Sequence, residues 1–172
     1  YGDSDEGNAH SVALAKGGRV LVQADEDRWV RTEAILVEDS TFDGPIEATF
    51  GTFRTLLPAE GLAAPAAYVG LGCPVRQGRD GASLAADPYL ADPRARVAIV
   101  DRGECSFVDK AIRAQAAGAV ALVVVNDAVA PIIPDGDVQA VHIPIALIDA
   151  EAGARLKVAL AAGPIPSLRF AT

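Results

Sequence analysis

Two unbroken apolar runs with a helical segment between them constrain the fold of this chain more than any other feature. The runs are residues 97–100 and 119–125, and residues 107–117 between them have apolar side chains at helical spacing. Strands without polar alternation are buried on both faces, and a helical crossover joins parallel strands with a right-handed connection. The sequence therefore predicts a βαβ unit at the centre of an α/β domain.

The predicted helix carries a start signal and a stop signal. Ser106 followed by Asp109 fits the spacing of a capping box, with Asp in place of the usual Glu. Gly118 stands where a residue of left-handed conformation commonly ends a helix. We therefore expect the helix to begin after Ser106 and to end before Gly118.

A second unit of the same kind follows along the chain. It consists of a strand over residues 143–148, Asp149 as the N-cap, a helix to about residue 160 and Gly163 as its stop. A last strand is expected over residues 167–171. The second half of the chain is thus predicted to contain two main helices.

The first half has the pattern of short strands and loops. Residues 11–24 read as a β-hairpin with a tight glycine turn at residues 16–18, and residues 29–37 continue the β-prone character. Prolines and glycines crowd residues 57–93, which we expect to form a loop with one extended piece around residues 68–71. At 172 residues the chain is long enough for one well-packed domain, or for one domain with an appended segment.

One long segment carries a family resemblance. Residues 97–126 read VAIVDRGECSFVDKAIRAQAAGAVALVVVN, and Ile143-Pro144 and the Gly-x-x-Leu at residues 153–156 follow. This pattern closely resembles the signature of the protease-associated domain family. The resemblance implies a three-layer β/β/α swivelling-type α/β domain with a βαβ core, two main helices and additional antiparallel strands.

The resemblance also implies a division of the chain. The close match covers about residues 97–160, with a looser match back to Cys73, and residues before about 49 do not match. We expect residues 49–172 to form the protease-associated domain. Residues 1–48 are expected to be a hairpin and strand segment, which supplies outer-sheet strands or is a remnant of a flanking domain.

The resemblance points to a site in the Arg-Gly turn. In plant vacuolar sorting receptors, the family's loop containing this turn helps to bind cargo peptide, which implies peptide binding by Arg102, Gly103 and Glu104. Asn126 and Asp127, which follow the next strand, complete the predicted peptide-binding set. In subtilisin-like proteases the family's module is not catalytic, and it also occurs in zinc aminopeptidases and transmembrane ubiquitin ligases.

The residues themselves allow two interpretations of this turn. Open α/β sheets usually bind ligands at the carboxyl ends of their strands, where the turn begins. Alternatively, Gly103 only permits the chain to turn, Phe107 belongs to the core, and Arg102 pairs with Asp101 or Asp127. Both interpretations remain open at this point.

The chain has two cysteines, Cys73 and Cys105. The resemblance implies that they form a disulfide, which requires an oxidising compartment, so we expect a secreted, extracellular or otherwise oxidised location. A metal site and a reactive thiol are the alternatives, but two cysteines and two distant histidines barely support a metal site. We expect no metal and no cofactor.

Composition and motifs exclude several classes of function. The net charge of −8 and the scattered distribution of the 15 Lys and Arg residues argue against nucleic acid as a partner. The apolar runs are too short for a bilayer of about 30 Å, so membrane insertion is not expected.

The candidate catalytic and metal-binding side chains are few. The two histidines, His10 and His142, lie in no recognisable catalytic context. Acidic clusters at residues 3–6, 25–27 and 135–137 are consistent with calcium binding or, more simply, with solvated turns.

The expected function is that of a non-catalytic module. The chain opens at Tyr1, contains no Met and lacks the features of a signal peptide, so we expect a fragment of a longer polypeptide. We predict a protein- or peptide-binding, substrate-recruiting domain of a larger secreted protein, with no enzymatic activity of its own. One alternative is a regulatory, access-shaping insert of a secreted subtilisin-like protease or zinc aminopeptidase; another is a purely structural or oligomerising module.

Overall fold

The computed structural model describes residues 9–15, 20–25, 32–38, 42, 45–51, 61–127, 139–162 and 166–170. The chain divides into two compact units, Tyr1–Arg31 and Thr32–Thr172. In the first unit, β1 (Ala9–Ala15) pairs antiparallel with β2 (Val20–Asp25), which confirms the predicted hairpin. Its predicted glycine turn at residues 16–18 lies outside the described residues.

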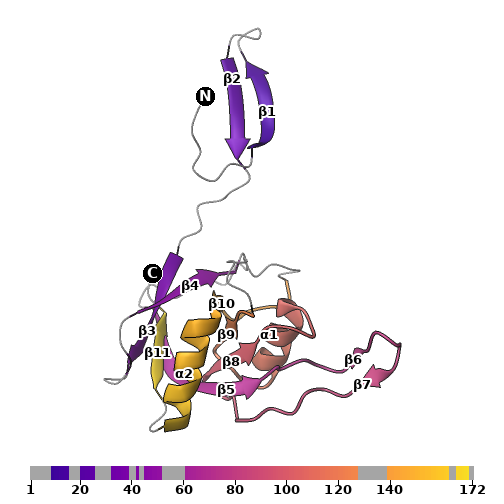
Figure 1. Cartoon of the computed structure of the whole chain (residues 1–172), viewed down its shortest axis with the longest axis vertical. Helices are drawn as coiled ribbons and strands as arrows, with labels where there is room; N and C mark the ends of the chain where they lie inside the picture. The colour runs from indigo at the N-terminus through magenta and orange to yellow at the C-terminus, as the bar shows by residue number, and fades with distance from the viewer. Residues whose placement is uncertain are drawn as a thin grey trace. The chain divides into compact units, whose positions relative to one another are not determined.

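The second unit contains a sheet that closes on itself (Figure 1). Its strands, in chain order, are β3 (Thr32–Glu38), β4 (Ile46–Phe50), β5 (Leu62–Gly70), β8 (Val97–Asp101), β9 (Ala121–Val125), β10 (Ile145–Ile148) and β11 (Ser167–Phe170). They pair in the order β10-β4-β3-β11-β5-β8-β9, and β9 pairs with β10 to complete the ring. The neighbours β5, β8, β9 and β10 run parallel, whereas the other pairs are antiparallel.

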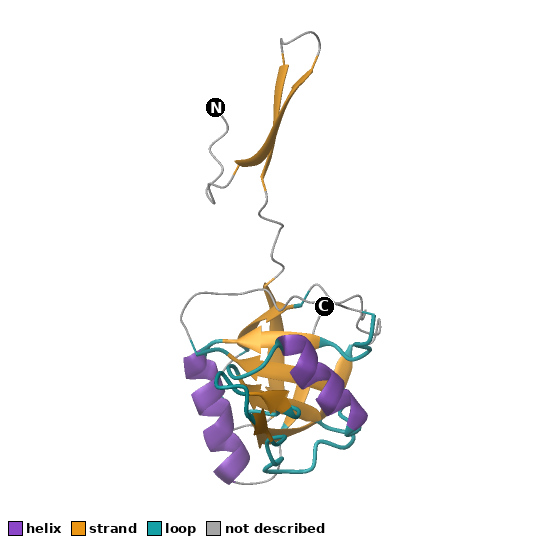
Figure 2. Ribbon diagram, turned by 90° about the vertical axis from the view of Figure 1, so that its right-hand side faces the viewer, coloured by secondary structure: helices purple, strands orange, loops and turns teal. Residues whose placement is uncertain are grey.

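Two helices pack against the parallel strands (Figure 2). The first, α1 (Phe107–Ala116), joins β8 to β9 and buries Ala111 and Ala114 against one face of these strands. The second, α2 (Ala150–Ala162), joins β10 to β11 and buries Leu156 in a separate core with Phe170. The mixed α/β class and the βαβ unit are therefore confirmed, while the three-layer swivelling arrangement stays a prediction.

Side chains cap both helices as their sequences predict. The hydroxyl of Ser106 accepts a hydrogen bond from the backbone N–H of Asp109 (3.1 Å) and donates one to its carboxylate (2.7 Å). Asp149 accepts a hydrogen bond of 2.6 Å from the backbone N–H of Ala152. Gly118 has a φ of +88°, the left-handed conformation that ends α1. The expected stop at Gly163 lies outside the described residues.

The prediction of an irregular chain over residues 57–93 is wrong for β5. This strand begins at Leu62, well before the extended piece expected around residues 68–71. The sheet tolerates Pro65 because of the direction in which its nitrogen points. Ala66 donates its backbone N–H toward β11, so the nitrogen of Pro65 points to the opposite side of β5, toward β8. Pairing between β5 and β8 begins only at Ala66. No ladder hydrogen bond is lost at the proline.

The rest of this segment forms a projecting arm, residues 71–96, between β5 and β8. It contains the short antiparallel strands β6 (Arg76–Gln77) and β7 (Ser83–Leu84). Figure 1 shows this hairpin extending away from the sheet of the second unit. Apart from these two short strands the arm is irregular, as its proline and glycine content predicts.

Helix α2 approaches the sheet closely at one glycine. A Cβ atom built on Gly153 would lie 2.1 Å from Cγ1 and 2.8 Å from Cγ2 of Val125 in β9. Such separations are shorter than any side chain accepts, so this position requires a residue without a side chain. The glycine of the predicted Gly-x-x-Leu pattern therefore sets the distance between α2 and β9.

The predicted division at residues 48 and 49 stays a prediction. The unit Thr32–Thr172 contains both β3 and β4, and β4 itself spans residues 46–50.

Most of the three acidic clusters lies outside the described residues. This holds for the clusters at residues 3–6 and 135–137, and for residues 26–27 of the cluster at residues 25–27. Within the described part of the chain, neither helix is long and apolar enough to cross a membrane.

Candidate functional site

The carboxyl ends of the parallel strands bring polar residues to one edge of the sheet. β8 ends at Asp101 and β9 ends at Val125, and these two residues are register partners. The next residues continue the pairing, because Arg102 donates its backbone N–H to Val125 (2.9 Å) and Asn126 donates to Ile148 (2.8 Å). The loops that follow β8 and β9 therefore start side by side.

Three of the five predicted site residues meet at this edge. The Nη1 nitrogen of Arg102 donates to Oδ1 of Asn126 and to Oδ1 of Asp127, each at 2.8 Å. Asn126 is buried, whereas the side chains of Arg102 and Asp127 are 29% and 63% exposed. The pairing of Arg102 with Asp127 is one of the two partners that the sequence suggested, while peptide contact stays a prediction.

Gly103 and Glu104 form the outer part of the same turn. Gly103 has a φ of +110° and Glu104 a φ of +65°, a left-handed conformation that is uncommon for glutamate. The Glu104 side chain is 61% exposed, and its Oε2 lies 4.0 Å from Nη2 of Arg76. Within the described part of the chain, neither residue forms a hydrogen bond or ion pair with the Arg102 side chain, whose partners are Asn126 and Asp127.

A disulfide joins Cys73 of the arm to Cys105 of the turn, with the Cα atoms 5.8 Å apart. Cys73 is completely buried, whereas Cys105 is partly exposed. The bond that the family resemblance implied is therefore present. It fastens the base of the arm next to the Arg102 loop.

Lys110 of α1 is buried beneath this disulfide. Its ammonium donates to the backbone carbonyl of Leu71 (2.5 Å) and lies 3.4 Å from Sγ of Cys73. Burial lowers the pKa of Lys110 to about 8, against opposing attraction from Asp87. In the sequence, this lysine stands within the segment that resembles the family signature, residues 97–126. Its position on the apolar side of α1, three residues after Phe107, is the signal that would have indicated burial.

Two arginines hold the arm in place. Arg113 donates from Nη1 to the carbonyl of Cys73 (2.6 Å) and from Nη2 to the carbonyl of Asp87, and its guanidinium lies 4.2 Å from the ring centroid of Tyr89. Arg76 forms an ion pair of 3.4 Å with the Asp87 carboxylate. Arg113 therefore attaches the arm to α1, whereas Arg76 joins two parts of the arm to each other and the disulfide attaches the arm to the turn before α1.

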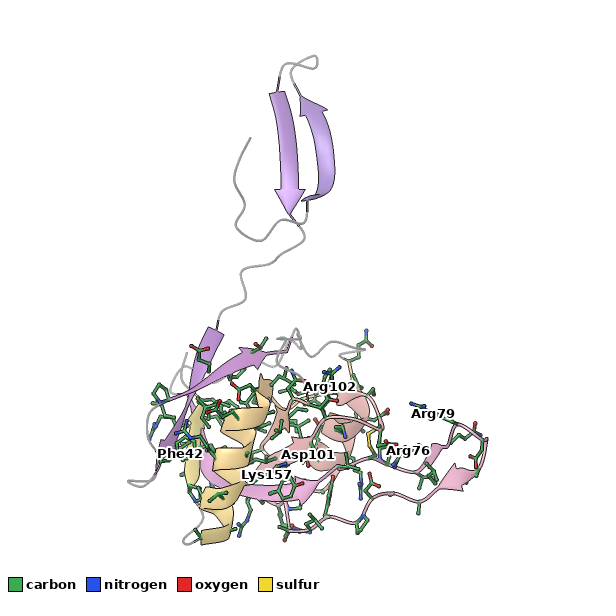
Figure 3. All side chains as sticks on the ribbon, viewed as in Figure 1. Phe42, Arg76, Arg79, Asp101, Arg102 and Lys157 are labelled. Carbon is green, nitrogen blue, oxygen red and sulfur yellow. A yellow bond between two sulfur atoms is a disulfide. The ribbon has the colours of Figure 1, made fainter. Side chains whose placement is uncertain are left out.

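A second polar cluster at the sheet edge was not predicted. The hydroxyl of Tyr68 donates to Oδ2 of Asp101 at 2.6 Å, and Lys157 of α2 forms an ion pair with the other oxygen. The Lys157 ammonium also lies 4.6 Å from the centroid of the Tyr68 ring. Figure 3 shows Asp101 and Lys157 close together. Asp101 therefore pairs with Lys157 and not with Arg102.

This cluster predicts delayed ionisation of Tyr68. Burial, followed by the hydrogen bond and the charge of Asp101, raises the pKa of Tyr68 from 10.0 to about 12. The folded protein keeps a proton that the unfolded chain loses above pH 10, so this contribution to stability is complete below pH 10 and declines as the pH approaches 12. In an ultraviolet titration of tyrosinate absorbance, Tyr68→Phe should remove the component that ionises nearest pH 12. Loss of a component near pH 10 would contradict the assignment.

The described residues contain no recognisable set of metal ligands or catalytic side chains. No group of three or more His, Cys, Asp or Glu side chains among them lies close enough to hold a metal ion. His142 is exposed, and its backbone N–H donates to the side chain of Gln115 (2.6 Å). The side chain of His10 lies outside the described residues. The site is therefore a polar, partly exposed surface around Arg102.

Comparison with known proteins finds similarity to peptidases. The family model described as PA domain matches residues 62–156, which is more than half of the chain. A PII-type proteinase of Lacticaseibacillus paracasei is 54% identical over 43 residues, covering 25% of this chain and 2% of the proteinase. "Probable leucine aminopeptidase 2" of Aspergillus fumigatus is 32% identical over 110 residues, covering 63% of this chain and 18% of that protein.

Solved structures show a related fold. An aminopeptidase from Aneurinibacillus sp. strain AM-1 superposes with a TM-score of 0.59 at 22% identity, covering 82% of this chain and 30% of the aminopeptidase. A zinc aminopeptidase from Bacillus subtilis gives the same TM-score and identity over 80% of this chain and 29% of its own length. The chain thus spans less than a third of each of these relatives.

Proposed function

The chain belongs to the protease-associated domain family, and from this premise we propose that it is a non-catalytic module that binds polypeptide for a longer secreted protein. The binding surface is the loop around Arg102, with Gly103, Glu104, Asn126 and Asp127. The disulfide supports an oxidising, extracellular type of compartment.

The geometry of Arg102 carries the proposal. Only Nη1 of its guanidinium forms hydrogen bonds with the described residues, so Nε and Nη2 are available to a ligand. Asn126 and Asp127 hold the guanidinium in place, which reduces the entropy that binding would cost. A guanidinium fixed in this way presents two donors to a peptide carbonyl or carboxylate.

The ends of the second unit support its role as an insert. β3, where the chain enters the unit, pairs antiparallel with β11, where the chain leaves it, and Ile35 is the register partner of Phe170. Entry and exit therefore lie at neighbouring positions of one sheet. A module with adjacent ends fits into a loop of a host protein without separating the residues on either side.

The test is peptide binding by the complete chain and by Arg102→Ala. We expect peptides selected on an array to bind the variant about tenfold more weakly in titration, since an Arg anchor is commonly worth one to two kcal/mol. Arg79→Ala is the matched control, because Arg79 is an exposed arginine of the arm, and it should bind like the original chain. A flat response across the array, or equal affinity of the Arg102 variant, would refute peptide binding.

Similarity to aminopeptidases and proteinases favours one alternative. In it the module shapes access to an active site of a secreted subtilisin-like protease or zinc aminopeptidase and binds no peptide itself. The sequence on either side of this chain in the full-length gene product separates the two, because a catalytic triad or a zinc-ligand set would support the alternative. A purely structural or oligomerising module predicts that no peptide binds.

A further inference from the structure

The two sulfur atoms of the disulfide have different surroundings. Cys73 is completely buried among Leu71, Lys110 and the base of the arm, whereas Cys105 is partly exposed in the turn. A molecule arriving from solvent therefore reaches Cys105 first. Of the two residues that form the disulfide, only Cys105 has surface in contact with solvent.

The buried sulfur faces a cation. The Lys110 ammonium lies 3.4 Å from Sγ of Cys73, and it also donates to the neutral backbone carbonyl of Leu71. The Asp87 carboxylate is instead occupied by Arg76 and by the backbone N–H of Cys73. The buried ammonium thus lacks a direct ionic partner among the described residues while Cys73 is oxidised. A thiolate at Cys73 would supply one.

We propose that Cys105 is a modification site at which a low-molecular-weight thiol forms a mixed disulfide, with Cys73 released as a thiolate that pairs with Lys110. Lys110 is a positioning residue in this exchange, because it acts on the leaving sulfur and does not touch the incoming thiol. The inference is independent of peptide binding.

The exchange balances in atoms and electrons. The incoming thiol loses its proton to solvent, and its thiolate attacks Sγ of Cys105. A new sulfur–sulfur bond forms there, the Cys73–Cys105 bond breaks, and its electron pair stays on Cys73. A second thiol that attacks the small thiol's sulfur completes the reduction, releasing a small-molecule disulfide and the thiolate of Cys105. A thiolate leaves faster when its pKa is low, and a neighbouring ammonium lowers that pKa.

The position of the adduct tests the proposal on the unaltered chain. The protein is treated briefly with reduced glutathione, quenched with acid, alkylated and mapped by mass spectrometry. We expect glutathione on Cys105 and the alkyl group on Cys73. Glutathione on Cys73, or equally on both cysteines, would overturn the proposal whether or not any variant folds.

The role of Lys110 is tested by Lys110→Met, with Lys157→Met as the matched control. Both variants lose one ammonium, but Lys157 contacts Asp101 and Tyr68 and not the disulfide. We expect exchange with glutathione to be about tenfold slower in the Lys110 variant and unchanged in the control. Equal slowing in both variants, or none in the first, would exclude Lys110 as the stabilising group. If Lys110→Met does not fold, titration of the Cys73 thiol in the reduced original chain replaces it, and an ordinary pKa there would equally refute the proposal.

Discussion

Replacement of both Cys73 and Cys105 by alanine is expected to lower the free energy of unfolding of the second unit by roughly 3 to 4 kcal/mol. The disulfide closes a loop over 32 positions that contains the arm from Cys73 onward. Without it the unfolded chain gains conformations, while the folded arm depends on polar contacts such as those of Arg113 and Arg76. This loss is a large part of the stability of a domain of this size.

The measurement is chemical denaturation followed by circular dichroism. Fluorescence is unsuitable because the single tryptophan, Trp29, belongs to the first unit. Reduction of the original chain serves as a control and should give a loss of similar size. A loss below about 1 kcal/mol in the double variant would show that the arm is held by its polar contacts alone.

Replacement of Gly153 by alanine is expected to lower the free energy of unfolding by about 2 kcal/mol, although alanine favours helices by about 1 kcal/mol over glycine. The added Cβ would lie 2.1 Å from Cγ1 of Val125, a branched side chain fixed in a central parallel strand. Relief requires α2 to move away from β9, which opens the core around Leu156. Thermal or urea denaturation measures the loss.

Val125→Ala provides the internal control for this prediction. Removing the two methyl groups makes room for the new Cβ, so the double variant should lose at least about 1 kcal/mol less than the sum of the two single variants. Additive losses would show that the clash at Gly153 lies with other atoms. A gain in stability from Gly153→Ala alone would show that α2 does not approach β9 as closely as described.

Local sequence patterns predicted those parts of the fold that depend on interactions between residues close together in the sequence. The apolar runs of β8 and β9, the Ser106 cap and the left-handed Gly118 each act within a few residues and were predicted from spacing alone. Strand β5 was missed because it contains four alanines and a proline, which have low strand propensity. Pairing with β11 and β8 outweighs the low strand propensity of these residues. Neither partner strand can be identified from the residues of β5 and their sequence neighbours.

The candidate site was predictable to a similar degree. The family pattern indicated Arg102 and the disulfide. The structure places Arg102 in contact with Asn126 and Asp127, which lie 24 and 25 positions later in the sequence. The cluster of Tyr68, Asp101 and Lys157 was not predicted, since its members lie 33 and 56 positions apart and belong to different elements. Contacts of this kind depend on the register of the strands, which single-sequence patterns do not determine.

The place of the last strand in the sheet affects how the protein can be made. β11 lies between β3 and β5, although both of these strands are complete by Gly70 and β11 begins only at Ser167. A ribosome that has not yet released residues 167–170 therefore holds a nascent chain in which β3 and β5 lack their shared neighbour and expose unpaired edges. Final closure of the sheet consequently follows emergence of Phe170 from the ribosome, and truncation before Ser167 should produce an aggregating chain.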